Sequence, residues 1–244
     1  MQKSVLMKAK IHLLILAVLL LIVYGVNAQT PNSNWADASV GLNSTWIINQ
    51  NVYGNMRMEY STTFGMTGGL GYCHIANDKF AFKSSIGICT LGQKYNASQE
   101  NEYATRTLKL TYLQIPLLFM RNMPLASDFT WVAIGPELLF LVGLKHEFKA
   151  SSGYILESPD FLIPGNPKDK FKTFDMALNF SLNKMYQLKE TNKLMFLFTV
   201  NTTIGLLDIN AKEWQIPNLV GDYRSSHNFY IGIKTGLMYK LPKH

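Results

Sequence analysis

Cysteine, charge and long apolar runs are all scarce in this chain of 244 residues. Two cysteines cannot supply the disulfide framework that holds many small secreted domains together. Charged residues make up 16% of the chain and hydrophobic residues 48%, which is too apolar for intrinsic disorder. The ordinary numbers of glycine (17) and proline (9) exclude collagen-like and low-complexity classes. The composition therefore predicts a folded chain with a core.

The first 28 residues have the pattern of a secretory signal peptide. Three lysines in the first ten residues precede an apolar run from Leu13 to Val23, and Ala28 is a small residue at the expected cleavage site. That run of 11 residues is short against the ~20 that a membrane-spanning helix needs. We therefore expect residues 1–28 to be removed, leaving 29–244. The charge then falls from +7 to +4, and nucleic acid is not indicated as a partner.

Large apolar residues fall on every second position through most of the mature chain, which is typical of β-strands with one apolar face. The clearest segment is 171–186, where the apolar face holds Phe174, Met176, Leu178, Phe180 and Leu182. A helix would scatter these side chains around its circumference. Similar alternation covers residues 36–48, 62–75, 80–95, 105–121, 130–145, 194–206 and 228–241. The sequence thus predicts an all-β chain of eight antiparallel strands.

Two further patterns refine this prediction. The apolar positions of segment 105–121 change parity at the Tyr112-Leu113 pair, which predicts a β-bulge there. Connections between the segments alternate between long and short: the long ones centre on Asn55, Gln99, Asp160 and Gln215. Such a series is typical of an up-and-down transmembrane barrel whose N- and C-termini lie in the periplasm. Loops 149–170 and 209–225 would then face outward from the cell.

The apolar face could meet lipid around a polar-cored barrel, or line a soluble lipocalin-like ligand-binding barrel. Three features favour lipid: strands of 13 or more residues, few charges on the opposite face, and aromatic residues near strand ends. The aromatic residues expected at the membrane interfaces are Trp46, Tyr95, Phe148, Tyr186 and Tyr239.

The polar face of the strands would line a narrow lumen filled by side chains. We expect six residues to point into it: Lys83, Glu137, Asp175, Asn179, Asn201 and Lys234. Glu137 and Lys234 fall at similar depth, so a buried ion pair between them could close the bore. Cys73 and Cys89 lie on consecutive strands about 20 Å apart, beyond bridging distance, which predicts two free, inward-facing thiols.

Several stretches carry a family resemblance. They are Tyr112-Leu-Gln-Ile-Pro116-Leu-Leu, then Ala133-Ile-Gly135-Pro136, and an opening Val40-Gly41-Leu42-Asn43. Together they resemble the small outer-membrane β-barrel family of Bacteroidota, often labelled the porin family. The resemblance implies an outer-membrane barrel with lipid and other envelope proteins as partners, and it says little about activity.

No serine stands at a recognisable catalytic spacing to a base, and the histidines show no metal-ligand spacing. We therefore expect no catalytic residues, no cofactor and no metal. The expected role is structural, in surface display or in envelope assembly. Membership of the type IX secretion apparatus is an alternative that loss of secreted cargo on deletion would decide.

Overall fold

The computed structural model describes residues 32–49, 59–99, 102–123, 130–151, 167–188, 193–215 and 223–242. The expected signal peptide, residues 1–28, lies outside these segments, and so do residues 152–166 and 216–222 of the two loops expected to face outward. Within the described segments, no helix is long and apolar enough to cross a membrane.

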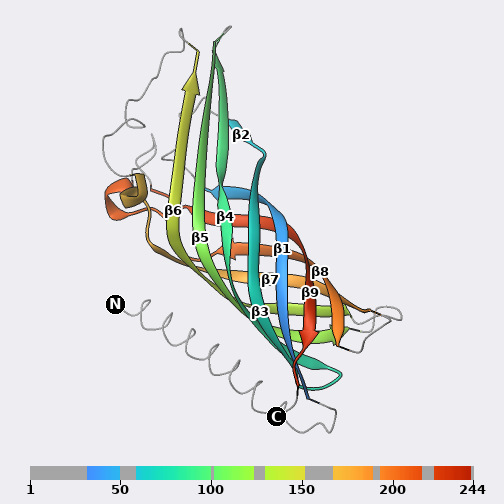
Figure 1. Cartoon of the computed structure of the whole chain (residues 1–244). Helices are drawn as coiled ribbons and strands as arrows, with labels where there is room; N and C mark the ends of the chain where they lie inside the picture. The colour runs from blue at the N-terminus through green and yellow to red at the C-terminus, as the bar shows by residue number, and fades with distance from the viewer. Residues whose placement is uncertain are drawn as a thin grey trace, which may run out of the picture.

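Nine antiparallel strands and two short 3-10 helices make up the described part of the chain (Figure 1). They are β1 (Ser33–Ile48), β2 (Glu59–Ser61), β3 (Thr63–Ile75), β4 (Phe80–Gln99), β5 (Glu102–Met123), β6 (Thr130–Ala150), η2 (Pro167–Lys170), β7 (Phe174–Gln187), β8 (Leu194–Gly205), η3 (Lys212–Trp214) and β9 (His227–Lys240). Neighbours in space follow the order β4-β3-β1-β9-β8-β7-β6-β5, and pairing of β4 with β5 closes the sheet into a ring. The sequence predicted eight strands. The ninth, β2, pairs only with β4, and three residues are too few to show an alternation.

The outer face of the ring is apolar on all eight of its strands. Exposed fractions reach 70% for Met66 and 64% for Val40 and Leu70. The same face includes Leu42, Phe64, Ile86, Ile88, Leu117, Ile134, Val142, Leu178, Phe180, Leu182, Phe198, Val200, Ile204, Ile231, Ile233 and Leu237. A soluble ligand-binding barrel needs its apolar face inside. The structure contradicts that alternative, because the face with the clearest apolar alternation points outward.

The interior is layered. At the end where β1 begins, a lower layer of buried apolar side chains contains Trp35, Cys73, Met120, Trp131, Met185, Leu197 and Met238. At the other end an upper layer contains Ile47, Cys89, Leu91, Tyr95, Leu108, Leu110, Tyr112, Leu139, Leu141, Phe171, Ile209, Trp214 and Tyr230. Along each strand of the ring, polar residues lie between the two apolar layers, and we call them the polar layer. Both cysteines are free and buried, as predicted.

The β-bulge lies on a different strand from the one predicted. Strand β5 keeps one parity throughout, with its even-numbered side chains buried from Ala104 to Met120. The register instead shifts where Thr111 pairs with Gly143 and Tyr112 with Leu141, which leaves Val142 as the extra residue on β6. Leu108 and Leu110 therefore point inward, into the upper layer. The bulge was predicted on β5 because large apolar residues lie on its inward face near Leu110 and on its outward face near Leu113, which looks like a change of parity in the sequence.

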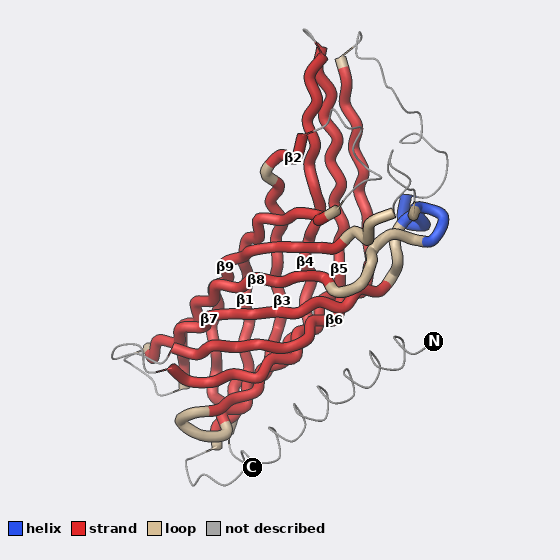
Figure 2. Tube along the Cα trace, turned by 180° about the vertical axis from the view of Figure 1, so that it is seen from behind, coloured by secondary structure: helices blue, strands red, loops and turns tan. Residues whose placement is uncertain are grey.

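Strands β4, β5 and β6 continue far beyond the ring, as Figures 1 and 2 show. Pairing of β6 with β7 ends at Phe140 and Phe174, whereas β6 continues to Ala150 beside β5. We call residues 91–99, 102–110 and 141–150 the extension. A long loop was expected around Gln99, but β4 and β5 are paired up to Gln99 and Glu102. The inward positions of this hairpin carry small or polar residues such as Ala97, Ala104 and Arg106, so few large apolar side chains mark it as a pair of strands.

One seam of the ring is joined by a side chain instead of a backbone ladder. Pairing of β1 with β3 ends at Thr45 and Thr63, and β2 pairs with β4 alone. The fully buried amide of Gln93 fills the gap: its Oε1 accepts from the Ile47 amide at 3.3 Å and its Nε2 donates to the Ser61 carbonyl at 3.1 Å. The amide therefore satisfies a donor on one side of the seam and an acceptor on the other.

Candidate functional site

The polar layer contains a buried ion pair between two strands that are separated by a third. Lys83 Nζ on β4 lies 3.1 Å from Asp37 Oδ1 on β1, with β3 between them. The side chain of Asp37 is 1% exposed and that of Lys83 10%. A Cβ on Gly71 of β3 would come within 2.3 Å of Asp37 Oδ2, so a glycine is needed where the carboxylate crosses the strand. Among the described residues, no side chain other than Lys83 neutralises Asp37.

Glu137 has different partners from the one predicted. Its Oε2 accepts from Asn179 Nδ2 at 2.6 Å, and its Oε1 accepts from the Tyr230 hydroxyl at 2.7 Å. The described part of the chain shows no ion pair between Glu137 and Lys234. The expected Glu137–Lys234 pair is therefore wrong. Similar depth along two tilted strands does not bring side chains on opposite walls into contact.

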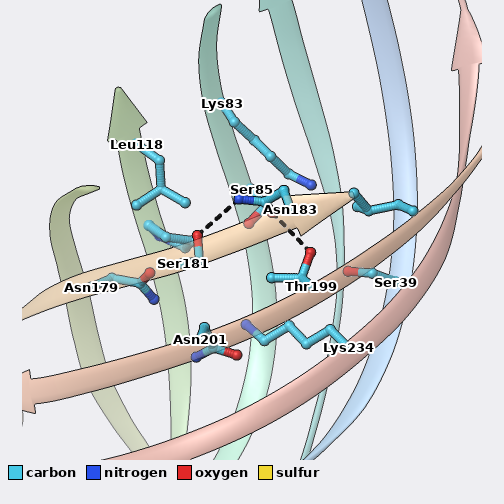
Figure 3. Close-up of a pocket in the computed structure, with 12 residues that line it drawn as sticks. Ser39, Lys83, Ser85, Leu118, Asn179, Ser181, Asn183, Thr199, Asn201 and Lys234 are labelled. Atoms are coloured by element: carbon cyan, nitrogen blue, oxygen red, sulfur yellow. Dashed lines mark hydrogen bonds between the residues drawn. The ribbon is translucent and has the colours of Figure 1, made fainter. Parts of the chain in front are cut away.

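A small cavity lies within the polar layer (Figure 3). Its volume is about 40 Å³, room for roughly three water molecules. The ammonium groups of Lys83 and Lys234 and the amide of Asn201 face it, together with hydroxyls such as those of Ser39 and Thr199. Both side-chain polar atoms of Asn201 are buried without a hydrogen-bond partner in the described structure. The cavity is thus lined by a buried amide whose hydrogen-bonding groups are unsatisfied.

Asp175 forms the upper boundary of the polar layer. Asn228 Nδ2 donates to Asp175 Oδ2 at 3.0 Å and lies 3.2 Å from the Tyr112 hydroxyl. Asp175 is 1% exposed, and Gly205 on the neighbouring strand leaves room for its carboxylate. All six residues predicted to face the lumen therefore lie inside the ring, although they do not gather in a single cluster.

The upper mouth of the ring is covered by the connections that lead into β7 and β9. Phe171 pairs with Asn210 in an isolated bridge, and Ile209 and Trp214 pack onto the upper layer. Asp208 holds this cover together: it accepts from the Tyr223 hydroxyl at 2.8 Å and from the Ser226 amide at 3.0 Å. Burial and the contact with Asp208 raise the pKa of Tyr223 to about 12. Side chains from both connections therefore close the mouth.

A basic cluster lies beside this cover, on the inner face of the extension. Arg106 is 2% exposed, and its Nε donates to His146 Nε2 at 2.9 Å. Lys170 lies over the Trp214 ring at 4.2 Å. Partial burial lowers the pKa of His146 from 6.5 to about 4, with Arg106 and Lys170 adding to the effect. His146 is therefore neutral at pH 7 and can accept the hydrogen bond.

This geometry makes the titration of His146 a test of the cluster. We expect its midpoint near pH 4, and the substitution Arg106→Met should raise it toward 6.5 by removing one nearby positive charge. Because the unfolded chain takes up the proton first, His146 should make the fold less stable as pH falls from about 6.5 toward 4. Histidine side-chain NMR measures the midpoint. Lys109→Met, on the outer face of the extension, is the control and should leave it unchanged. An unshifted midpoint in Arg106→Met would contradict the assignment.

Of the five aromatic residues expected at membrane interfaces, three point outward and two do not. Trp46 packs against Phe229 with ring centroids 5.6 Å apart, and Tyr186 and Tyr239 are 40% and 47% exposed. Tyr95 is 1% exposed in the upper layer, and Phe148 packs on Ala97 and Ala104 inside the extension. Both belong to strands that run past the ring, so their position near a strand end did not indicate an interface.

Sequence reasoning missed Asp37 and Gln93. Asp37 has the parity opposite to Val40 and Leu42, so alternation in β1 alone could have placed it in the lumen. Gln93 carries no such signal, because its role depends on where the pairing of β1 with β3 ends. Groups of three or more potential metal ligands are absent from the described residues.

Comparison with known proteins gives structural likeness only. No protein-family model matches the chain, and no curated protein matches its sequence. The outer membrane protein OprG from Pseudomonas aeruginosa has a TM-score of 0.43 at 10% identity, over 88% of this chain and 97% of that one. The outer membrane protein AlkL in DMPC bilayers scores 0.40 at 12% identity, over 89% and 94%. Ail, the attachment invasion locus protein of Yersinia pestis, scores 0.34 at 7%, over 84% and 99%. Scores this low transfer no function.

Proposed function

We propose that this chain is a non-enzymatic β-barrel that spans the outer membrane with a closed lumen. The observation that carries the proposal is the continuous apolar belt around the ring. Between its aromatic ends, the outward positions of the described strands carry a single charged residue, Lys184. The Lys184 ammonium lies 5.1 Å from the Tyr186 ring, so it reaches toward the edge of the belt. Water would be a poor solvent for such a surface.

The height of the belt matches a bilayer. Outward aromatic pairs mark its two edges: Trp46–Phe229 and Phe140–Phe174 above, and Tyr186–Phe196 and Phe82–Phe119 below. On β9, Tyr239 follows Phe229 by ten positions. At about 3.4 Å per residue and a tilt of about 40°, that length gives about 26 Å, close to the ~25 Å apolar band of outer-membrane barrels.

The filled interior supports a structural role for the barrel and argues against a role as a channel through which solutes diffuse. Two apolar layers and the polar layer fill the ring, and the connections into β7 and β9 cover its upper mouth. Eight strands enclose a bore that side chains nearly fill. We therefore propose that the barrel anchors the extension and its adjoining loops at the cell surface, with lipid and other envelope proteins as partners. The lower end, where Ser33 and Lys240 lie, would face the periplasm.

Planar-bilayer recording tests the closed lumen. The purified barrel should insert without producing stable conductance steps, because the two apolar layers formed by the described residues fill the bore. A 16-stranded porin recorded in the same membranes serves as the positive control. A reproducible unit conductance from the folded protein would show that the layers open, and the closed barrel would have to be abandoned.

A further inference from the structure

The cavity in the polar layer has the chemistry of an anion site. We propose that it binds one small inorganic anion of the size of chloride, held by the ammonium of Lys234 and an amide N–H of Asn201. This inference goes beyond the proposed membrane role and does not depend on it, because it rests on the interior of the ring alone.

Lys234 contributes a positive charge without a paired carboxylate. Its stem crosses β1 at Gly41, where a Cβ would lie 2.7 Å from Lys234 Cγ, so the side chain is directed into the ring. Within the described residues, Lys234 takes part in no ion pair. A charge inside a protein costs free energy unless a partner of opposite sign compensates it.

The charges around the cavity favour an anion over a cation. Lys83 and Lys234 are among its lining residues, and no carboxylate is. Lys83 also contacts Asp37, which leaves Lys234 as the ammonium with no partner of its own. Glu137 is the nearby acid to consider, and Asn179 and Tyr230 already donate to its two oxygens.

Asn201 supplies the second, independent observation. It is 3% exposed, it lines the cavity, and neither its amide nitrogen nor its oxygen has a hydrogen-bond partner in the described structure. The glycine at 232 provides the space beside it, because a Cβ there would lie 3.0 Å from Asn201 Oδ1. A buried amide without partners is costly, and an anion accepting from its N–H would remove part of that cost.

The volume limits the ligand. About 40 Å³ holds a single monoatomic anion with water and excludes organic phosphates and carboxylates of metabolite size. Figure 3 shows Lys83, Ser39 and Lys234 around the same space, so the Ser39 hydroxyl lies on the wall that carries the two ammonium groups, whereas the Thr199 hydroxyl already donates to Asn183 Oδ1.

Crystals of the detergent-purified protein grown in sodium bromide provide the direct test. We expect an anomalous difference peak within hydrogen-bond distance of Lys234 Nζ and Asn201. Lys234→Met should abolish this peak, while Lys145→Met, which removes an exposed lysine of the extension, should retain it. A cavity without anomalous signal in the unaltered protein would mean that water alone fills it. A peak that persists in Lys234→Met would equally overturn the assignment.

Thermal unfolding gives a second readout that needs no crystals. At constant ionic strength, replacing gluconate by chloride should raise the melting temperature of the unaltered protein by about 3 °C or more, since chloride binds the folded state. Lys145→Met should show the same rise, and Asn201→Leu should show less than half of it. Equal melting temperatures in the two salts would refute chloride binding.

Discussion

Replacing Lys83 by methionine is expected to lower the free energy of unfolding by about 3 to 5 kcal/mol. The cause is Asp37, which would stay buried with its described counter-charge removed. The ion pair itself gains little over an apolar pair, because both groups lose their hydration. Removing only one of the two charges lowers the free energy of unfolding, because the other charge then stays buried without a partner. Urea unfolding in lipid vesicles, followed by heat-modifiable gel mobility, measures the change.

Two controls separate this effect from general damage. Asp37→Asn combined with Lys83→Met should recover most of the loss, because the carboxylate left behind becomes a neutral amide of the same shape. Lys145→Met breaks the exposed Lys145–Glu147 pair and should leave the urea midpoint nearly unchanged. A double variant as unstable as Lys83→Met alone would show that packing, and not the uncompensated charge, dominates.

The substitution Phe180→Arg should lower the free energy of unfolding by about 2 to 4 kcal/mol, because it puts a cation near the middle of the bilayer. Phe180 is 43% exposed and lies midway along β7 between Phe174 and Tyr186. No strand of the ring offers a nearby partner for the new charge, because its outward neighbours Ile134 and Thr202 are uncharged. Folding into phospholipid vesicles across a urea series measures the loss.

The matched control is the same substitution at the edge of the belt. Phe174→Arg replaces an outward phenylalanine of similar exposure, 38%, near the upper interface, where the cost of arginine falls to about 0 to 1 kcal/mol. The difference between the two positions, therefore, reports depth in the membrane. Equal costs at Phe174 and Phe180 would argue against a lipid-embedded belt.

Much of the ring was predictable because strand alternation is a local property. Phe174, Leu178 and Phe180 alternate with Asp175 and Asn179 over enough residues to identify β7 and assign its outward face. Strand β5 was harder, since Leu108 and Leu110 are as apolar as Leu113 and Ile115 on the other side. A period of two identifies the two faces of such a strand without saying which is inside.

The arrangement of the polar layer was less accessible. Parity predicted that Lys83, Glu137 and Lys234 face the lumen, but their partners depend on the tilt and stagger of the closed sheet. Asp37 meets Lys83 across β3, while Glu137 is taken by Asn179 and Tyr230. These contacts follow from the register of the whole ring, which no single strand encodes.

The carboxamide that joins β1 to β2 makes one position of the wall depend on a single side chain. A ladder of main-chain bonds tolerates almost any sequence, whereas position 93 must offer an acceptor and a donor at once. Glutamate there would keep the acceptor for Ile47 and abandon Ser61, and leucine would abandon both. Loss of this one amide would thus weaken the contact between β1 and β2. The other neighbouring strands of the ring are held together by backbone hydrogen bonds.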